Sequence, residues 1–137
     1  MNKDDFIKKV MQQLNIQDKN VAERGVQIVL SILSHRLTVE EASDVADQLP
    51  HDLKRIWNNQ IWITNYFFLS GKRLKYRHKV ELMSLVENEI LREGLPLHAE
   101  SLTKAVLHTL KDQITPGEAE DISAQLPEEL RDFFKAA

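Results

Sequence analysis

Apolar residues recur every third or fourth position along most of the chain, the spacing that places them on one face of an α-helix. The widest such faces lie within 22–37 and 99–114, and we expect them to form the centre of the core. They consist of ten residues: Val26, Val29, Leu30, Leu33, Leu37, Leu102, Val106, Leu107, Leu110 and Ile114. Capping residues, prolines and polar breaks then divide the chain into eight predicted helices, at 3–14, 20–36, 39–48, 50–58, 77–92, 98–112, 116–125 and 127–135. The pattern therefore predicts an all-α protein.

The second half of the chain repeats the first. A shift of 77 residues places 22–57 on 99–134 without a gap and with 13 identical residues. We predict two quasi-equivalent four-helix units, about 3–58 and 77–135, packed into one pseudo-two-fold helical domain over 1–137 and joined by an aromatic and basic connector at 59–76. Two independent bundles are the alternative, and about 55 residues would give each only a marginal core.

The repeated positions carry helix-start and helix-stop signals. Thr38 with Glu41, and Thr115 with Glu118, have the spacing of a capping box. In that motif the hydroxyl accepts the glutamate N–H and the carboxylate accepts the threonine N–H. Leu-Pro then ends the third helix of each unit, because the residue before proline avoids the α region. Capping and termination thus explain most of what is repeated.

The repeated pattern also suggests a family. V-L-x-x-L followed by E-A-x-D-[VI]-x-x-Q-L-P-x-x-L occurs in both halves. This tandem resembles the bacterial family catalogued as domain of unknown function 2267, and the resemblance covers nearly the whole chain. It implies a tandem helical fold. The family has no established activity, so the resemblance implies no functional residues.

Charge is unevenly distributed along the chain, whose net charge is −3. No acid lies between Asp52 and Glu81, where there are seven basic residues, while the rest holds 11 basic and 21 acidic residues. Aromatic rings interleave with these cations. The possible interaction surface consists of Trp62, Lys72, Arg73, Lys75, Tyr76, Arg77 and Lys79. Rings and cations together suit nucleic acid or an acidic membrane surface, but aromatics also fill seams between helical layers.

Other candidate chemistry is weak. Glu41, Asp44 and Gln48 share a helical face, as do their counterparts Glu118, Asp121 and Gln125. Such acids could meet at a divalent cation, although capping explains their spacing without one. The five histidines have no zinc-site spacing, and the chain has no cysteine. We therefore predict no catalytic, cofactor-binding or metal-binding residue.

The preferred hypothesis is a non-enzymatic protein-interaction module, with self-association included. An anion-binding module using 54–79 for nucleic acid or acidic lipid is the alternative, and an enzyme or metal binder using acids of both repeats is more distant. The amino terminus has acids where a signal peptide needs an apolar stretch, and no apolar run is long enough to span a bilayer. A cytoplasmic protein is expected.

Overall fold

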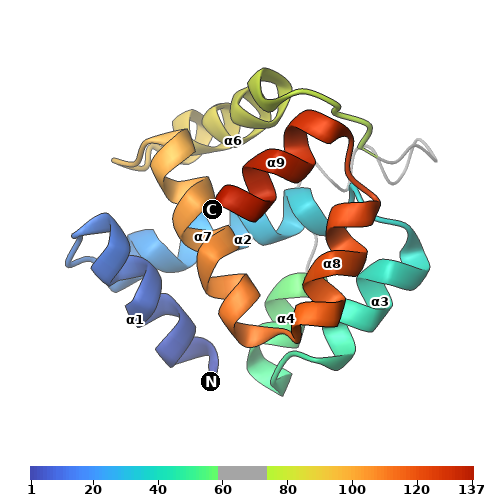
Figure 1. Cartoon of the computed structure of the whole chain (residues 1–137). Coiled ribbons are helices and arrows are strands. Elements are labelled where there is room, and N and C mark those ends of the chain that lie inside the picture. The colour runs from blue at the N-terminus through green and yellow to red at the C-terminus, as the bar shows by residue number, and fades with distance from the viewer. Residues whose placement is uncertain (59–73) are drawn as a thin grey trace.

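The computed structural model describes residues 1–58 and 74–137, which form eight helices and no strand (Figure 1). None of these helices combines the length and the apolar character needed to cross a membrane. The prediction of an all-α protein is confirmed. The first copy contains α1 (Lys3–Leu14), α2 (Lys19–Ser34), α3 (Val39–Asp47) and α4 (His51–Asn58), and the second contains α6 (Lys79–Glu93), α7 (Ala99–Gln113), α8 (Pro116–Ala124) and α9 (Glu128–Ala136).

The start of α6 differs from the prediction by two residues, for a local reason. The backbone N–H groups of Arg77 and His78 both donate to Oε1 of Glu81, at 3.2 and 3.1 Å. This carboxylate satisfies amides that precede the helix, so His78 becomes the N-cap and α6 begins at Lys79. The connector predicted at 59–76 lies outside the described residues up to 73.

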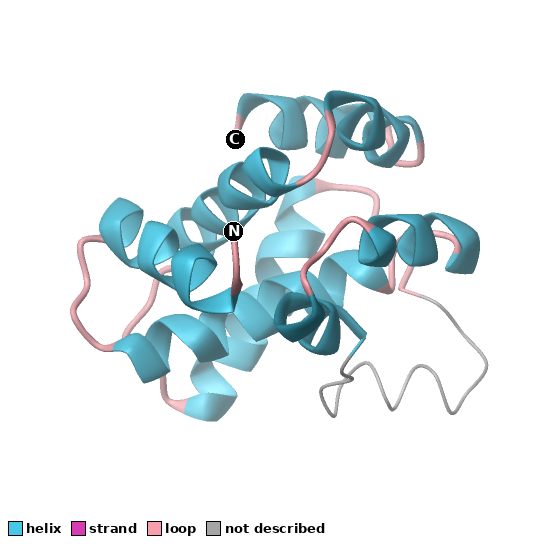
Figure 2. Ribbon diagram, turned by 90° about the horizontal axis from the view of Figure 1, so that it is seen from below, coloured by secondary structure: helices cyan, strands magenta, loops and turns pink. Residues whose placement is uncertain are grey.

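Helices of the two copies contact one another throughout the described chain. The first helix of each copy packs on the second helix of the other, α1 on α7 and α6 on α2. The two second helices, α2 and α7, also contact each other, and α3 lies beside α8 (Figure 1). Figure 2 shows the same helices gathered around one centre. The two copies are therefore not independent bundles.

One core is shared by both copies. The second helices and the residues that follow them supply its centre, where all ten apolar residues expected there are buried: Val26, Val29, Leu30, Leu33, Leu37, Leu102, Val106, Leu107, Leu110 and Ile114. Trp57 of α4 is 1% exposed, and its indole N–H donates to the carbonyl oxygen of Ala42 at 2.9 Å. That bond ties α4 to α3.

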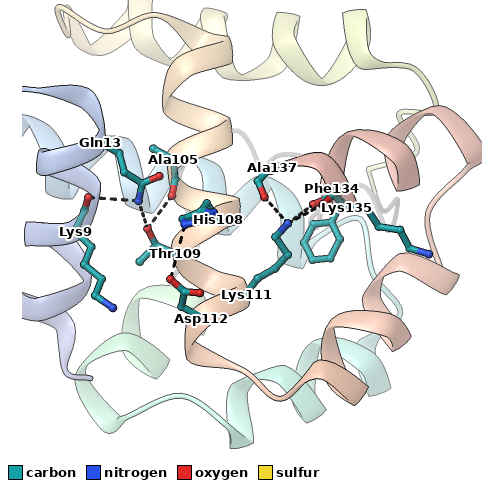
Figure 3. Close-up of polar contacts among 10 residues, drawn as sticks. All are labelled: Lys9, Gln13, Ala105, His108, Thr109, Lys111, Asp112, Phe134, Lys135 and Ala137. Carbon is teal, nitrogen blue, oxygen red and sulfur yellow. Dashed lines mark hydrogen bonds and ion pairs between the residues drawn. The ribbon is translucent and has the colours of Figure 1, made fainter.

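Polar contacts also connect separate helices, as Figure 3 shows. Gln13 of α1 donates through Nε2 to Oγ1 of Thr109 on α7 at 2.8 Å. Lys111 of α7 donates through Nζ to the carbonyl oxygens of Phe134 (2.8 Å) and Lys135 (3.2 Å). Carbonyls in the last turn of a helix lack intrahelical donors, so this ammonium group holds the end of α9 against α7.

The contact between α2 and α7 is close at Gly25. A Cβ atom added there would lie 2.8 Å from Cδ1 of Leu102 and 3.0 Å from Cδ1 of Leu97. Leu102 is fully buried, so it has little room to move aside. The absence of a side chain at Gly25 therefore sets how closely the two central helices approach.

We expect Gly25→Leu to lower the free energy of unfolding by about 1–3 kcal/mol, because overpacking a dense core forces side chains out of their rotamers. Chemical denaturation would measure it. Gly117→Ala is the control, since the nearest atom to its added Cβ is Oγ1 of Thr115 at 4.0 Å. Equal stability of Gly25→Leu and the parent would contradict the close approach.

Candidate functional site

The amino termini of α3 and α8 are capped across the repeat boundary. The backbone N–H of Thr38 donates to Oε1 of Gln125 at 3.0 Å, and Nε2 of Gln125 donates to Oγ1 of Thr38 at 3.1 Å. In the reverse direction, the N–H of Thr115 donates to Oε1 of Gln48 at 2.9 Å. Each glutamine thus serves the start of the equivalent helix in the other copy.

This exchange corrects half of the capping prediction. The threonine half is confirmed, because Oγ1 of Thr38 and of Thr115 accepts the N–H of Glu41 and of Glu118, each at 3.1 Å. The carboxylate half is wrong. The threonine N–H groups donate to glutamines of the other copy, so neither glutamate carboxylate is needed for the cap.

The two glutamates meet instead at the contact between α3 and α8. One carboxylate oxygen from each of Glu41, Glu118 and Asp121 lies within 4.8 Å of those of the other two. Glu41 is 7% exposed and Glu118 is 8% exposed, whereas Asp121 is exposed to solvent. We call these three residues the acid cluster. Its ligand atoms come from both copies of the repeat.

Hydrogen bonding leaves part of the acid cluster unsatisfied. Oε2 of Glu118 accepts from Nε2 of Gln48 at 3.3 Å. Oε1 of Glu41 and Oε1 of Glu118 are buried, and no hydrogen-bond donor in the described part of the chain reaches them. A buried polar atom left in this way costs about 1–3 kcal/mol, so the cluster opposes folding unless a proton or another positive charge reaches it.

The surroundings of Glu41 favour its protonated form. Burial, then a hydrogen bond to Glu118, and then the negative charges of Glu118, Asp121 and Asp44 raise the pKa of Glu41 to about 8. Every charged neighbour among these causes is an acid. A proton on Glu41 allows the two glutamates to hydrogen-bond near neutral pH. The cluster can hold a proton, or it can offer oxygen ligands to a cation.

The described part of the predicted interaction surface divides into buried and exposed residues. Trp62, Lys72 and Arg73 lie outside the described residues. Lys75 and Arg77 are exposed, while Tyr76 between them is only 5% exposed. Tyr76 therefore belongs to the core instead of the surface where it was expected.

Tyr76 is held at both its backbone and its side chain. Its hydroxyl donates to the carbonyl oxygen of Ile32 at 3.2 Å, and its own carbonyl oxygen accepts from Nε of Arg36 at 2.8 Å. Leu74 is also buried. Residues 74–77 thus alternate between buried and exposed, so the segment is anchored by every second side chain.

Lys79, the last member of that predicted surface, is engaged within the chain. Its ammonium group forms an ion pair with Glu100 and lies 5.3 Å from the centroid of the Phe133 ring. Its backbone N–H donates to Oε1 of Glu129 at 2.9 Å. These contacts satisfy a cation at the start of a helix, where the helix dipole alone would disfavour it.

The glutamine exchange is what sequence reasoning missed. Gln48 and Gln125 are identical in the two copies, and both stand at the ends of helices. Repetition at corresponding positions was the available signal. It could not reveal that each glutamine serves the other copy, because that depends on how α3 and α8 are placed.

Comparison with known proteins identifies the family of the chain. The model of a family described as an uncharacterized conserved protein, DUF2267, matches residues 3–133. The chain belongs to this family. Because the match spans both copies, it confirms the resemblance drawn from the duplicated motif. No curated protein matches the chain. The description of the family names no activity, so the chemistry of this member is argued from its geometry.

We expect Gln125→Ala to lower the free energy of unfolding by about 1 kcal/mol, because the variant loses two hydrogen bonds at the start of α3. Combining it with Thr38→Ala in a double-mutant cycle should show coupling between the two residues. Gln17→Ala is the control, since Gln17 is exposed in the turn between α1 and α2. Strictly additive effects of Gln125→Ala and Thr38→Ala would contradict the cross-copy cap.

We expect the free energy of unfolding to fall as pH rises from about 4.5, the ordinary pKa of Glu41, to about 8. The folded state holds a proton there that the unfolded state has lost, so the stability it gives is complete below this window and is lost above it. The Glu41→Gln variant has no carboxyl proton to lose at this position, so its free energy of unfolding should not show this part of the decrease with pH. At pH 9 the variant should be more stable than the parent by about 1–3 kcal/mol.

Thermal and chemical unfolding from pH 4 to 9, with a chelator present, would measure this difference. The buried Glu89, whose pKa is also raised by burial, remains in both proteins and cancels in the comparison. Glu40→Gln is the control, because Glu40 is exposed on the same helix. Parallel curves for Glu41→Gln and the parent would refute the shared proton.

Proposed function

We propose that the protein is a non-enzymatic protein-interaction module that contacts an acidic partner surface through Lys75 and Arg77. The observation that carries the proposal is the anchored segment 74–77, whose buried residues fix the backbone while Lys75 and Arg77 extend into solvent. A surface that is ordered before binding loses less conformational entropy when a partner arrives.

The two cations are available for contact. Among the described residues, neither the Lys75 side chain nor the Arg77 side chain has an ion pair or hydrogen bond, in contrast to Lys79 with Glu100. Charged groups at the edge of an interface mainly steer encounter and set orientation. Lys75 and Arg77 fit that role.

The surroundings of Arg77 favour a protein partner over a polyanion. Arg77 shares an open surface hollow with Glu128, Glu129 and Asp132. Carboxylates at these positions repel a continuous row of phosphate groups and also a uniformly acidic protein surface. The partner surface that fits therefore has acids opposite Lys75 and Arg77 and basic groups opposite these carboxylates. The buried ring of Tyr76 is also unavailable for stacking on a base. These observations support protein contact above the nucleic-acid or lipid alternative.

A second copy of the chain offers a suitable acidic surface. The exposed acids of α3 include Glu40 and Asp44, whereas Asp47 of α3 and Glu120 of α8 form ion pairs with Lys54 (3.6 Å) and Lys135 (3.4 Å). They lie on helices other than the one preceded by Lys75 and Arg77, so one copy could present acids to the cations of the next. We therefore expect the protein to self-associate through contact between Lys75 and Arg77 of one copy and exposed acids of another.

Light scattering over a concentration series tests it. We expect the average mass of the parent to rise with concentration at 50 mM salt and to fall toward the monomer at 500 mM, because salt screens exposed charges. Lys75→Glu with Arg77→Glu should stay monomeric. Lys8→Glu with Lys9→Glu makes the same change in net charge on the exposed face of α1 and should behave as the parent.

Two results would count against the proposal. A constant monomer mass for the parent at every concentration would remove self-association. Retention on heparin that is lost in the 75/77 variant but kept in the 8/9 variant would favour the anion-binding alternative instead.

A further inference from the structure

The acid cluster is an incomplete arrangement of charges in the interior of the protein. Glu41 and Glu118 are each more than nine-tenths buried, and each has one carboxylate oxygen without a donor. Transferring carboxylates from water into a protein is costly unless opposite charge or hydrogen bonds compensate. Among the described residues the compensation is limited to the hydrogen bond between the two glutamates and the amide of Gln48, and one oxygen of each glutamate has no donor.

The donors near the acid cluster are directed elsewhere. The N–H groups of Thr38 and Thr115 donate to the two exchanged glutamines, and the N–H groups of the two glutamates donate to threonine hydroxyls. Within residues 1–58 and 74–137, the single amide that reaches the cluster is Nε2 of Gln48, which donates to Oε2 of Glu118. The glutamates are thus unnecessary for capping, yet both copies of the repeat carry one at this position.

We propose that Glu41, Glu118 and Asp121 form a binding site for a divalent cation that prefers oxygen ligands, with Ca²⁺ the best fit. Three carboxylate oxygens, two of them from buried residues and one from an exposed residue, lie within 4.8 Å of one another. Ligands on opposite sides of a Ca²⁺ ion lie about 5 Å apart, twice its metal–oxygen distance. Oxygen atoms within this distance of one another can share one Ca²⁺ ion.

The composition of the cluster sets its selectivity. Its ligand atoms are all carboxylate oxygens, which suit Ca²⁺, Mg²⁺ and Mn²⁺ better than the softer metals. Mg²⁺ demands a near-ideal octahedron of ligands and gives up its water molecules reluctantly, whereas Ca²⁺ accepts an irregular set of carboxylate ligands. We therefore expect Ca²⁺ and Mn²⁺ to bind more tightly than Mg²⁺.

The position of the cluster leaves the cation a path from solvent and allows a bound cation to connect two helices. Asp121 is exposed, so an ion can enter from solvent on that side and keep water molecules as its remaining ligands. Glu41 lies on α3 and Glu118 on α8, so a bound ion joins one helix of each copy. Because the ion binds the folded protein and not the unfolded chain, it raises the midpoint temperature of thermal unfolding.

Calorimetric titration and thermal unfolding of the chelator-treated full chain test the site, with CaCl₂, MnCl₂ or MgCl₂ as the probe at constant ionic strength. We expect saturable binding of one ion and a midpoint that rises with ion concentration. In an NMR titration, Mn²⁺ should first broaden the amide resonances of 41–44 and 118–121.

Variants locate the binding. Glu118→Gln and Asp121→Asn should each weaken Ca²⁺ at least tenfold, and Asp121→Asn changes an exposed side chain, so its folding is not in question. Glu40→Gln, which removes an exposed acid next to Glu41, should bind within twofold of the parent. No binding by the parent at 10 mM of any of the three ions would overturn the proposal, as would equal binding by the parent, Glu118→Gln and Asp121→Asn.

Discussion

The whole structure depends on the burial of two apolar helices that neither copy of the repeat can cover by itself. The second helices, α2 and α7, contact each other, and each also receives the first helix of the other copy. About 55 residues bury a small share of their surface, so an independent copy would have only a marginal core. The interlocked arrangement solves this by making one core from both copies, and Gly25 sets how closely its two central helices approach.

The contact between α3 and α8 follows from that shared core. Placing these helices side by side lets Gln48 and Gln125 cap the equivalent helices of the opposite copies. The same placement brings Glu41 and Glu118 together, and the glutamines accept the threonine N–H groups in place of these two carboxylates. Charge repulsion and missing donors are thus consequences of pairing two equivalent helix starts.

The basic segment before α6 shows a second effect of packing on charge. Sequence alone groups Lys75, Arg77 and Lys79 as neighbouring cations. In the folded chain Lys79 pairs with Glu100, while Lys75 and Arg77 extend from an anchored backbone beside acids of α9. The resulting surface carries both signs of charge.

The sequence by itself determined the helices, the duplication and the ten core residues of the second helices, because hydrophobic periodicity and capping are local properties that act within a few residues. Only the tertiary structure decided which copy supplies each cap, where Tyr76 lies and that Glu41 meets Glu118. Those outcomes depend on contacts between residues far apart in the chain. In the sequence, Thr38 and Glu41 have the spacing of a capping box. That spacing is the same whether the carboxylate of Glu41 contacts Thr38 or contacts Glu118, which lies 77 residues further along the chain.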